Sequence, residues 1–507
     1  TQHSVDVLEQ IRGRHPEWVS GPDERDDFSH WMEVRSGPDG EAEKLANVSE
    51  ERLVEEAMRL QREDNFQQGD IWRVFCAADP GRALRGLLSE AEGKNWNSEA
   101  WRSLINAAMN VEATDFQERL ANAVLDMPNA TLLEILTPAT QWLERKRAAI
   151  GPHFLALWDE MGALAYPETE AGSDEPDDDS DLMFEVLNRP GGILAWSLLD
   201  ALGASQPAKD SGLPESFRDR FNQMITADGR AGLLARVLIA ERLNFLHFVD
   251  PNWTYQNLIP KLGWDHHEAK AMWQGYARSR IGAANVFNRL KPAMLEAIEK
   301  RKLGDNELQS ILASLVSVAI WHHRGEGAEF EFADAELRRL LTIGPSSLRS
   351  HVSWMLWRVM SDVDDSTDDE PSSRSNLWNE VVGPLFSAIW PLDASLRDKQ
   401  TSQNLVHMIL DCGNAMPNAV ARVSDYLIPY QLYEISHTLR LDEKHDAMVA
   451  QYPLPFIQLA NVLIDPDAYP VPRDLRKLLD DCAAADQSVK HDDAYIRLDG
   501  LARQAGA

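Results

Sequence analysis

The sequence predicts an all-α protein, and two observations support the prediction. Apolar residues recur with the period of a helix in segment after segment, as in 49–60, where those from Leu53 to Leu60 share one face. Alternating strand patterns are nearly absent, and the best candidate, residues 328–332, is very short. We therefore expect helices throughout the chain.

The N-terminal third illustrates the pattern element by element. Each apolar segment is bounded by Pro, Gly, Asn or Asp, and after 49–60 the expected helices are 71–76, 80–92, 99–109, 115–126, 131–142 and 153–164. Helices this short and amphipathic cannot bury their apolar faces alone, so consecutive antiparallel pairs must stack on their neighbours. No strict period of the tetratricopeptide or ankyrin kind is present. The prediction is an irregular HEAT-like helical-repeat solenoid or a large helical array.

Two acidic stretches divide the chain. Residues 168–181 contain eight acidic side chains and residues 362–375 contain six, each stretch with a proline, so we predict flexible acidic loops. Neither has the glycine-centred spacing and terminal glutamate of a calcium-binding EF-hand loop. The loops separate an N-terminal helical region (1–167), a central one (182–361) and a C-terminal one (376–507). Whether these are independent domains or segments of one superhelix stays open.

The charge balance limits the classes of partner. The chain has 81 Asp and Glu against 50 Lys and Arg, a formal net charge of -31. Such a field repels phosphate backbones, so we expect protein partners and no direct binding of nucleic acid. The densest cationic run, Glu144 to Arg147, is predicted to be a solvated helix face.

Cysteine use and apolar runs indicate the compartment. The three cysteines, Cys76, Cys412 and Cys482, have neither the spacing of a metal site nor that of a disulfide framework. No apolar run approaches the about 20 residues that span a bilayer, and the N-terminus lacks the plan of a signal peptide. We expect a soluble cytoplasmic protein with no membrane contact. Because the sequence opens at Thr1 rather than Met, we also expect a piece of a longer protein.

Metal-binding residue types occur in two places. Asp265–Glu268 contains adjacent histidines, but neighbouring helical residues point about 100° apart and cannot easily share one tetrahedral ion. Ala271 stands where a zincin-like motif would place the second ligand of His267. The pair His322–His323 is subject to the same argument, so we expect helix-end or surface histidines and no metal.

Catalytic motifs are missing from the sequence. There is no phosphate-binding GxxxxGK[ST] or GxGxxG loop and no GxSxG elbow, and a turn explains the glycine pair in Arg189–Ile193. We predict no catalytic residues, no cofactor and no enzymatic activity for this chain. The alternative, an enzyme whose site is assembled from side chains distant in sequence, would require a deep pocket with strongly perturbed titratable groups.

Aromatic residues among polar neighbours are the candidates for partner contact. Trp253 and Tyr255 lie among amides, and Trp273 and Tyr276 form a similar segment. The alternative for Trp253 is a proline-initiated loop whose tryptophan packs back into the core, and the Trp273–Tyr276 segment has the same two interpretations, partner contact or core. Six further tryptophans at helical spacing are expected to fill the gaps between helices: Trp96, Trp101, Trp158, Trp196, Trp354 and Trp357.

Scattered tryptophan motifs resemble those of a known family. They include His15–Trp18, Asp26–Trp31, the 49–54 helix followed by Asp64–Phe66, the segment Trp264–Arg280, and Leu377–Val381 with Ile389–Leu392. In these segments the chain resembles the helical region that follows the catalytic domain in bacterial defence-associated, sirtuin-like proteins. Those proteins deplete NAD on phage infection, and their helical region assembles the complex and senses the invader.

The resemblance implies a non-catalytic sensing or scaffolding role. The glycine-rich dinucleotide loop and the catalytic Asn and His of the sirtuin-like domain have no counterpart in this sequence, so no catalytic residue is carried over. The expected partners are a phage protein or an NAD-hydrolysing effector domain outside this chain, in an oligomeric assembly. The alternative is a general protein-protein interaction scaffold or adaptor with no immune role.

Overall fold

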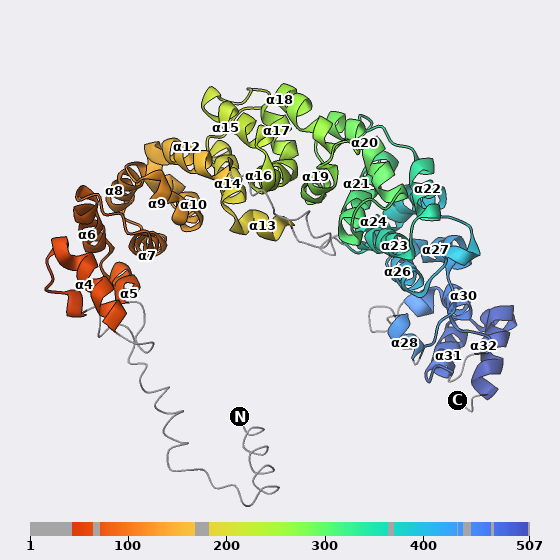
Figure 1. Cartoon of the computed structure of the whole chain (residues 1–507). Coiled ribbons are helices and arrows are strands. Elements are labelled where there is room, and N and C mark those ends of the chain that lie inside the picture. Colours follow the sequence, from red (N-terminus) through yellow and green to blue (C-terminus); the bar gives the residue numbers. More distant parts are fainter. Residues whose placement is uncertain are drawn as a thin grey trace, which may run out of the picture. The chain divides into compact units, whose positions relative to one another are not determined.

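The structure, a computed structural model, describes residues 43–63, 71–167, 182–362, 370–432, 434–439, 448–467 and 471–504. Every regular element in these ranges is a helix, which confirms the predicted all-α class (Figure 1). The strand candidate at 328–332 is part of an irregular connection between two helices. The chain forms two compact units.

Unit 1 comprises residues 1–207 and 214–238. Its helices are η1 (Glu43–Leu45), α4 (Glu50–Glu63), α5 (Ile71–Ala78), α6 (Pro80–Glu92), α7 (Ser98–Ala108), α8 (Thr114–Leu125), α9 (Asn129–Glu134), α10 (Leu136–Arg145), α11 (Arg147–Ile150), η2 (Gly151–His153), α12 (Phe154–Ala165), α13 (Leu182–Asn188), α14 (Pro190–Ala204), α15 (Glu215–Thr226) and most of α16 (Gly229–Glu241).

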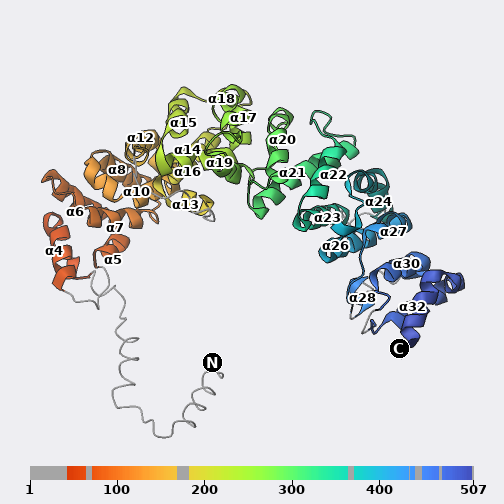
Figure 2. The same ribbon diagram turned by 45° about the vertical axis from the view of Figure 1, so that its right-hand side comes forward.

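Helices of unit 1 pack in two layers. In one layer α4 lies on α6, α6 on α8, and α8 on α12, while in the other α5 lies on α7, α7 on α10, and α10 on α14 (Figures 1 and 2). Contacts between the layers, such as α4 with α5 and α6 with α7, bury the apolar face of each helix. This order of contacts is compatible with the predicted helical-repeat array.

Unit 2 comprises residues 208–213 and 239–507. After the end of α16, its helices are α17 (Leu243–Val249), α18 (Pro251–Asn257), η3 (Ile259–Leu262), α19 (Ala269–Tyr276), α20 (Ala284–Glu299), α21 (Asp305–His323), α22 (Asp334–Ile343), α23 (Ser346–Ser361), α24 (Glu370–Leu377), the π-helical η4 (Trp378–Val382), α25 (Gly383–Ile389), η5 (Ala394–Leu396), α26 (Lys399–Leu410), η6 (Gly413–Ala415), α27 (Met416–Val423), η7 (Ser424–Tyr426), α28 (Ile435–Thr438), α30 (Pro453–Leu463), α31 (Leu475–Ala485), η8 (Gln487–His491) and α32 (Asp493–Gln504).

A similar progression runs through unit 2. The helices α20, α22, α25, α27, α30 and α32 contact one another in that order, and α21, α23 and α26 form a second series beside them. The pair α23 and α26 is the most extensively packed. The helices at the chain end, α30, α31 and α32, contact one another and form a small cluster.

One predicted helix is divided in the structure. Residues 131–142 belong to α9 and α10, which are separated at Ile135. The cause is Pro138, because a proline ring inside a helix collides with the carbonyl four residues earlier, here that of Glu134, and offers no N–H. The chain turns at Ile135, whose carbonyl then accepts from the N–H of Ala139 at 3.0 Å.

The boundaries of the compact units differ from the divisions inferred from the acidic stretches. Residues 168–181 and 363–369 lie outside the described residues, and the units divide near residues 207–214 and within α16. Residues 370–375, predicted to belong to the second flexible loop, are part of α24 (Glu370–Leu377). Arg374 and Ser375, expected in a flexible loop, are buried.

Tryptophans link helices that are distant in sequence. The indole N–H of Trp72 donates to the carbonyl of Ala100 at 2.9 Å, and that of Trp158 donates to Leu194 at 2.9 Å. In unit 2, the Trp378 indole donates to Asn418 at 2.9 Å. Such rings bury a large apolar area and satisfy their polar atom. The predicted gap-filling role holds for Trp101 and Trp158, which are buried, while Trp354 is 43% exposed.

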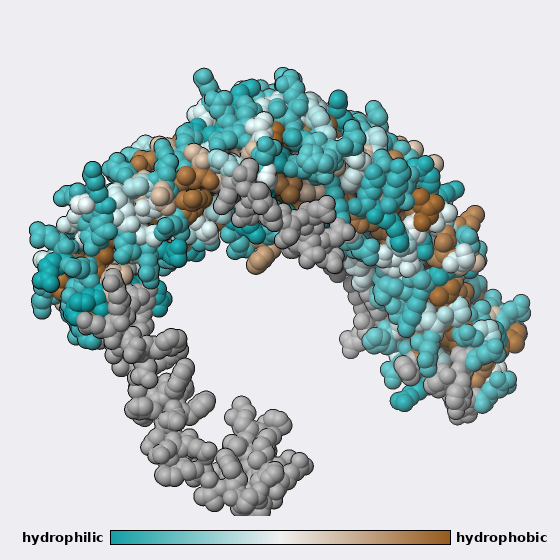
Figure 3. Space-filling view, in the orientation of Figure 1, coloured by the Kyte–Doolittle hydropathy of each residue, from teal (hydrophilic) through white to brown (hydrophobic). Residues whose placement is uncertain are grey.

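The exterior is largely hydrophilic on the face shown in Figure 3, with separated hydrophobic patches. Among the described residues, no helix combines the length and the apolar character that crossing a bilayer would require.

Candidate interaction surfaces

Trp253, predicted as an exposed partner contact, is a core residue. It lies in α18 and is 4% exposed. The segment is a helix because Asp250 caps it, with its carboxylate accepting from the N–H of Trp253 at 2.9 Å, and because Pro251 suits the first turn. The capped helix directs the indole inward, so the alternative is confirmed in placing Trp253 in the core, while the segment that carries it is a helix rather than a loop.

Trp273 and Tyr276 are buried as well, which corrects their predicted exposure. Trp273 is 0% exposed, stacks on Trp264 with ring centroids 5.7 Å apart, and donates its indole N–H to the carbonyl of Leu262 at 2.8 Å. Tyr276 meets the Trp273 ring edge-on at 5.2 Å. We name Trp264, Trp273 and Tyr276 the aromatic cluster. Its rings fill the space around α19, with Trp264 half-buried and Trp273 and Tyr276 buried, so the two predicted contact residues offer little surface to a partner.

Tyr255 is the predicted contact residue that remains partly exposed. Its hydroxyl lies 3.2 Å from the Nε2 atom of His247, and the Arg289 guanidinium lies over its ring at 5.5 Å. Burial raises the pKa of Tyr255 and lowers the pKa of His247. The side chain therefore links α17, α18 and α20, and a role in partner binding stays a prediction.

The histidine pairs are placed differently from one another. His266 and His267 lie in a turn before α19 with their rings stacked at 4.6 Å, and the side chain of His267 is 82% exposed. His322 and His323 end α21: the first lies 2.8 Å from the carbonyl of Phe330 and the second 3.1 Å from the carboxylate of Asp334. No cluster of three metal-ligating residue types occurs in the part of the chain that the structure describes.

The cationic run at 144–147 is not the solvated face that its sequence predicts. Lys146 is 6% exposed and its ammonium pairs with Glu112 at 2.6 Å, while Arg147 pairs with Asp200 at 2.6 Å. The run lies where α10 ends and α11 begins, and the helix break turns Lys146 inward. Lys146 and Arg147 therefore bind acidic residues elsewhere in unit 1, Glu112 in the connection between α7 and α8 and Asp200 in α14.

A first candidate surface is the outer face of α13 in unit 1. Leu182, Met183 and Val186 are buried beneath the helix. On its other face Phe184 is 68% exposed and Leu187 is 52% exposed. These two residues are three positions apart and so share one side of the helix. A helix apolar on both faces is typical of an element that a partner covers.

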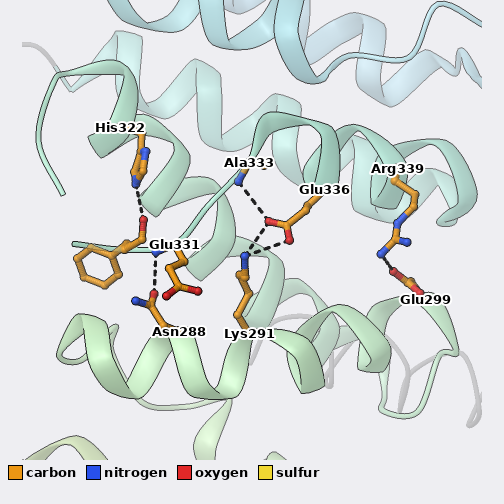
Figure 4. A network of polar contacts seen from close by, with 9 residues as sticks. Asn288, Lys291, Glu299, His322, Glu331, Ala333, Glu336 and Arg339 are labelled. Atoms are coloured by element: carbon orange, nitrogen blue, oxygen red, sulfur yellow. Dashed lines mark hydrogen bonds and ion pairs between the residues drawn. The ribbon is translucent and has the colours of Figure 1, made fainter. Parts of the chain in front are cut away.

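The second candidate surface is built around α22 in unit 2, and a polar network fixes that helix on α20. The ammonium of Lys291 lies 3.0 Å from both carboxylate oxygens of Glu336 (Figure 4). Glu336 also accepts from the N–H of Ala333 at 3.2 Å, so it satisfies a free donor at the start of α22. Ala333 has no side-chain acceptor, so only half of a capping box is present. The first turn of α22 is therefore fixed by Glu336.

Further contacts hold the approach to α22 and its middle. The amide of Asn288 binds the connection preceding α22 at two points, donating to the carbonyl of Glu329 at 3.0 Å and accepting from the N–H of Glu331 at 2.8 Å. Arg339 extends toward Glu299 at the other end of the network (Figure 4). The network spans α20, the end of α21 and α22, and it holds the outer face of α22 in a fixed orientation.

That outer face forms one wall of an open groove. The groove has a volume of about 500 Å³ and is lined by Ala335, Arg338, Arg339, Thr342 and Ile343 of α22 and by Ala388 of α25. The five residues of α22 follow the i, i+3, i+4 spacing of one helix side, while Leu337, Leu340 and Leu341 are buried on the opposite side. We name this feature the α22–α25 groove.

The groove combines an apolar surface with positive charge. Ile343 is 56% exposed, and Ala335 and Ala388 add small apolar side chains to the lining. Arg338 donates to the carbonyl of Ser387 at 2.9 Å and has no carboxylate partner among the described residues. The lining holds two cations and no acid, in a chain whose net charge is -31. The groove is therefore a local electropositive site in an acidic protein.

Sequence reasoning missed both surfaces because it searched for aromatic residues among polar ones. The available signal was an apolar residue on the polar side of an otherwise amphipathic helix, as for Ile343 in α22 and Phe184 in α13. Adjacent arginines in a strongly acidic chain were a second signal, at Arg338 and Arg339.

Comparison with known proteins gives one relative of low identity. The chain is 22% identical over 513 aligned residues to "Uncharacterized protein y4cA" of Sinorhizobium fredii (strain NBRC 101917 / NGR234). The alignment covers 99% of this chain and 41% of that relative, so the chain spans less than half the length of the protein it matches. No protein family matches the chain. No solved structure matches it.

Proposed function

We propose that this chain is a non-catalytic helical scaffold that binds protein partners. The observation that carries the proposal is the outer face of α13, where Phe184 and Leu187 are 68% and 52% exposed on a helix whose other face is already buried. Exposed apolar pairs of this kind mark protein interfaces more often than isolated exposed residues do. The open α22–α25 groove supports the same function in the other unit.

Capture of partners from the native cell, after crosslinking, tests this function. The wild-type chain is compared with the double variant Phe184→Ser/Leu187→Ser, and with Leu133→Ser as a control, because Leu133 is an exposed leucine of α9 at 48%. We expect one defined partner to be recovered in stoichiometric amount with the wild type and the control, and to be lost with the double variant. A chain that recovers no defined partner under any of these conditions contradicts the scaffold function.

The role that we propose for this scaffold is the sensing region of a bacterial anti-phage protein, controlling an NAD-hydrolysing, sirtuin-like effector outside the chain. The support is the sequence resemblance of the tryptophan motifs. Of these, 15–18, 26–31 and 64–66 lie outside the described residues, while Trp264 and Trp273 form the aromatic cluster. The relative from Sinorhizobium fredii is also more than twice as long as its matching region.

The measurement for this role is NAD consumption by the full-length gene product, with and without phage challenge, beside the 507-residue chain alone. NAD loss with the full-length protein and none with the chain is the expected result. Absence of NAD loss in every sample would contradict the defence role and leave a general scaffold, which the partner capture tests independently.

A further inference from the structure

We infer that the α22–α25 groove binds an acidic amphipathic helix of a partner protein. The inference rests on the proposed scaffold function and specifies the chemistry of one of its partners. Three properties of the groove support it: its length, its apolar side chains and the positive charge of Arg338, which no carboxylate balances among the described residues.

The geometry of the groove fits a helix. The lining residues from Ala335 to Ile343 cover about two turns of α22, or about 12 Å at 1.5 Å per residue. Two of the lining side chains, those of Ala335 and Ala388, are small and let another backbone approach closely. Ile343 stands 56% exposed at one end and can pack against an apolar stripe. A helix laid along a groove with anchors at i, i+3, i+4 and i+7 is an established mode of recognition.

The charge of the groove selects an acidic helix. The Arg338 guanidinium has five donor positions and uses one on the carbonyl of Ser387. Arg339 pairs with Glu299, but its side chain is 56% exposed and the pair faces solvent. A carboxylate flanking an apolar stripe would meet the Arg338 guanidinium in bidentate geometry, and a second carboxylate would share Arg339 with Glu299. The negative charge of the rest of the chain repels acidic partners, so those without an apolar stripe to pack against Ile343 are disfavoured.

Nucleic acid is the less favoured occupant of the same groove. Binding of a phosphate backbone requires a continuous cationic path, and the groove supplies two arginines with an exposed isoleucine beside them. The surrounding net charge of -31 opposes a polyanion over its whole length, whereas a short helix contacts only the groove.

The test is a selection from a displayed library of helical peptides of about 14 residues, about four turns, against the full chain. We expect selected sequences with an apolar stripe flanked by Asp and Glu. For the best of them, Arg338→Glu should lower the affinity at least about tenfold, and replacing the acids of the peptide by lysine should restore binding to that variant.

Two further variants separate the apolar and structural contributions. Ile343→Asp should abolish binding, whereas Ile496→Asp, at a residue of α32 that is also 56% exposed, should leave it unchanged. Circular dichroism and thermal unfolding of each variant show that the fold is kept. The inference would be overturned if the selected peptides lacked acidic residues, or if their binding were unaffected by Arg338→Glu or Ile343→Asp. Failure to select any sequence, or tighter binding of a DNA oligonucleotide at this groove, would overturn it as well.

The two proposals can fail separately. If the native partner is still captured by Ile343→Asp and Arg338→Glu variants, the scaffold function stands and the groove is not its site. If no native partner is captured although acidic helices bind the groove, the inference stands as a property of the surface and the proposed function fails.

Discussion

The aromatic cluster and the α22–α25 groove lie in the same unit and have opposite roles. The cluster contains two of the four residues that the sequence indicated as partner contacts, yet Trp273 is 0% exposed and its indole N–H is satisfied by the carbonyl of Leu262. The groove contains no aromatic residue, yet Ile343 is 56% exposed beside two arginines. Large aromatic rings are most stabilising where they fill space between short helices. A surface of this fold is therefore found from the outward side of its helices rather than from its aromatic content.

The largest expected effect is at the aromatic cluster. Trp273→Ala removes a buried indole together with its stacking on Trp264 and its hydrogen bond to Leu262, and should lower the free energy of unfolding by about 3–5 kcal/mol. Urea denaturation followed by circular dichroism measures it. Trp354→Ala, at a tryptophan that is 43% exposed, is the control and should have a much smaller effect. Equal losses at the two positions would show that the distinction between core and surface is wrong here.

The network that fixes α22 should give the next largest effect. Glu336→Ala removes the partner of Lys291 and the acceptor for the N–H of Ala333, and should destabilise the protein by about 1–3 kcal/mol. Lys291→Met keeps the cap and should cost less. The comparison uses the same denaturation measurement. If Lys291→Met were the more destabilising of the two, the helix-capping role of Glu336 would be refuted.

The pH dependence should come from buried histidines of unit 2. Burial lowers the pKa of His247 below its ordinary value of 6.5, with Asp210 opposing and Lys209 reinforcing the shift, while Tyr255 and Arg289 complete its surroundings. The unfolded chain therefore binds the proton more readily than the folded chain. His247 does not destabilise the fold by this route above about pH 6.5, and the free energy of unfolding falls as the pH drops from there toward the lowered pKa.

Replacement of His247 should reduce this dependence. The free energy of unfolding of the wild type and of His247→Asn is measured at each pH between about 7 and 5. The wild type should lose more stability on acidification than the variant, so the difference between the two should change with pH. His267→Asn is the control, since that side chain is 82% exposed. A difference that is constant with pH would show that His247 does not contribute.

The smallest effect on stability is expected at the groove itself. Arg338→Glu and Ile343→Asp alter exposed side chains outside the core, so the free energy of unfolding should change by less than about 0.5 kcal/mol. Thermal unfolding measures this. Losses comparable to that of Glu336→Ala would make the groove residues part of the structural framework and would weaken their assignment to partner binding.

The sequence was sufficient for the class of fold but not for several local details. Helical periodicity predicted α6 over the residues that form it, because its apolar face and its flanking Asp79 and Gly93 all agree. It missed the break at Ile135, because the effect of Pro138 on Glu134 acts through the helix rather than through the hydrophobic pattern. Lys146 was predicted to be solvated because its partner, Glu112, is far away in sequence.

The candidate surfaces were beyond single-sequence reasoning for a related reason. A groove requires two helices, and the sequence does not indicate that α25, with Ala388, packs beside α22. Exposure likewise depends on what covers a residue, so Trp253 and Phe184 could not be assigned to inside and outside from their neighbours in the chain.

The most direct test of the scaffold account is hydrogen–deuterium exchange of the chain with and without its captured native partner. The account predicts slower exchange in α13, α22 or α25 when the partner is bound, with no change in η3 and α19 around the aromatic cluster. Protection confined to α19, or an identical exchange pattern in both samples, would contradict the claim that partners bind the outward faces of these helices.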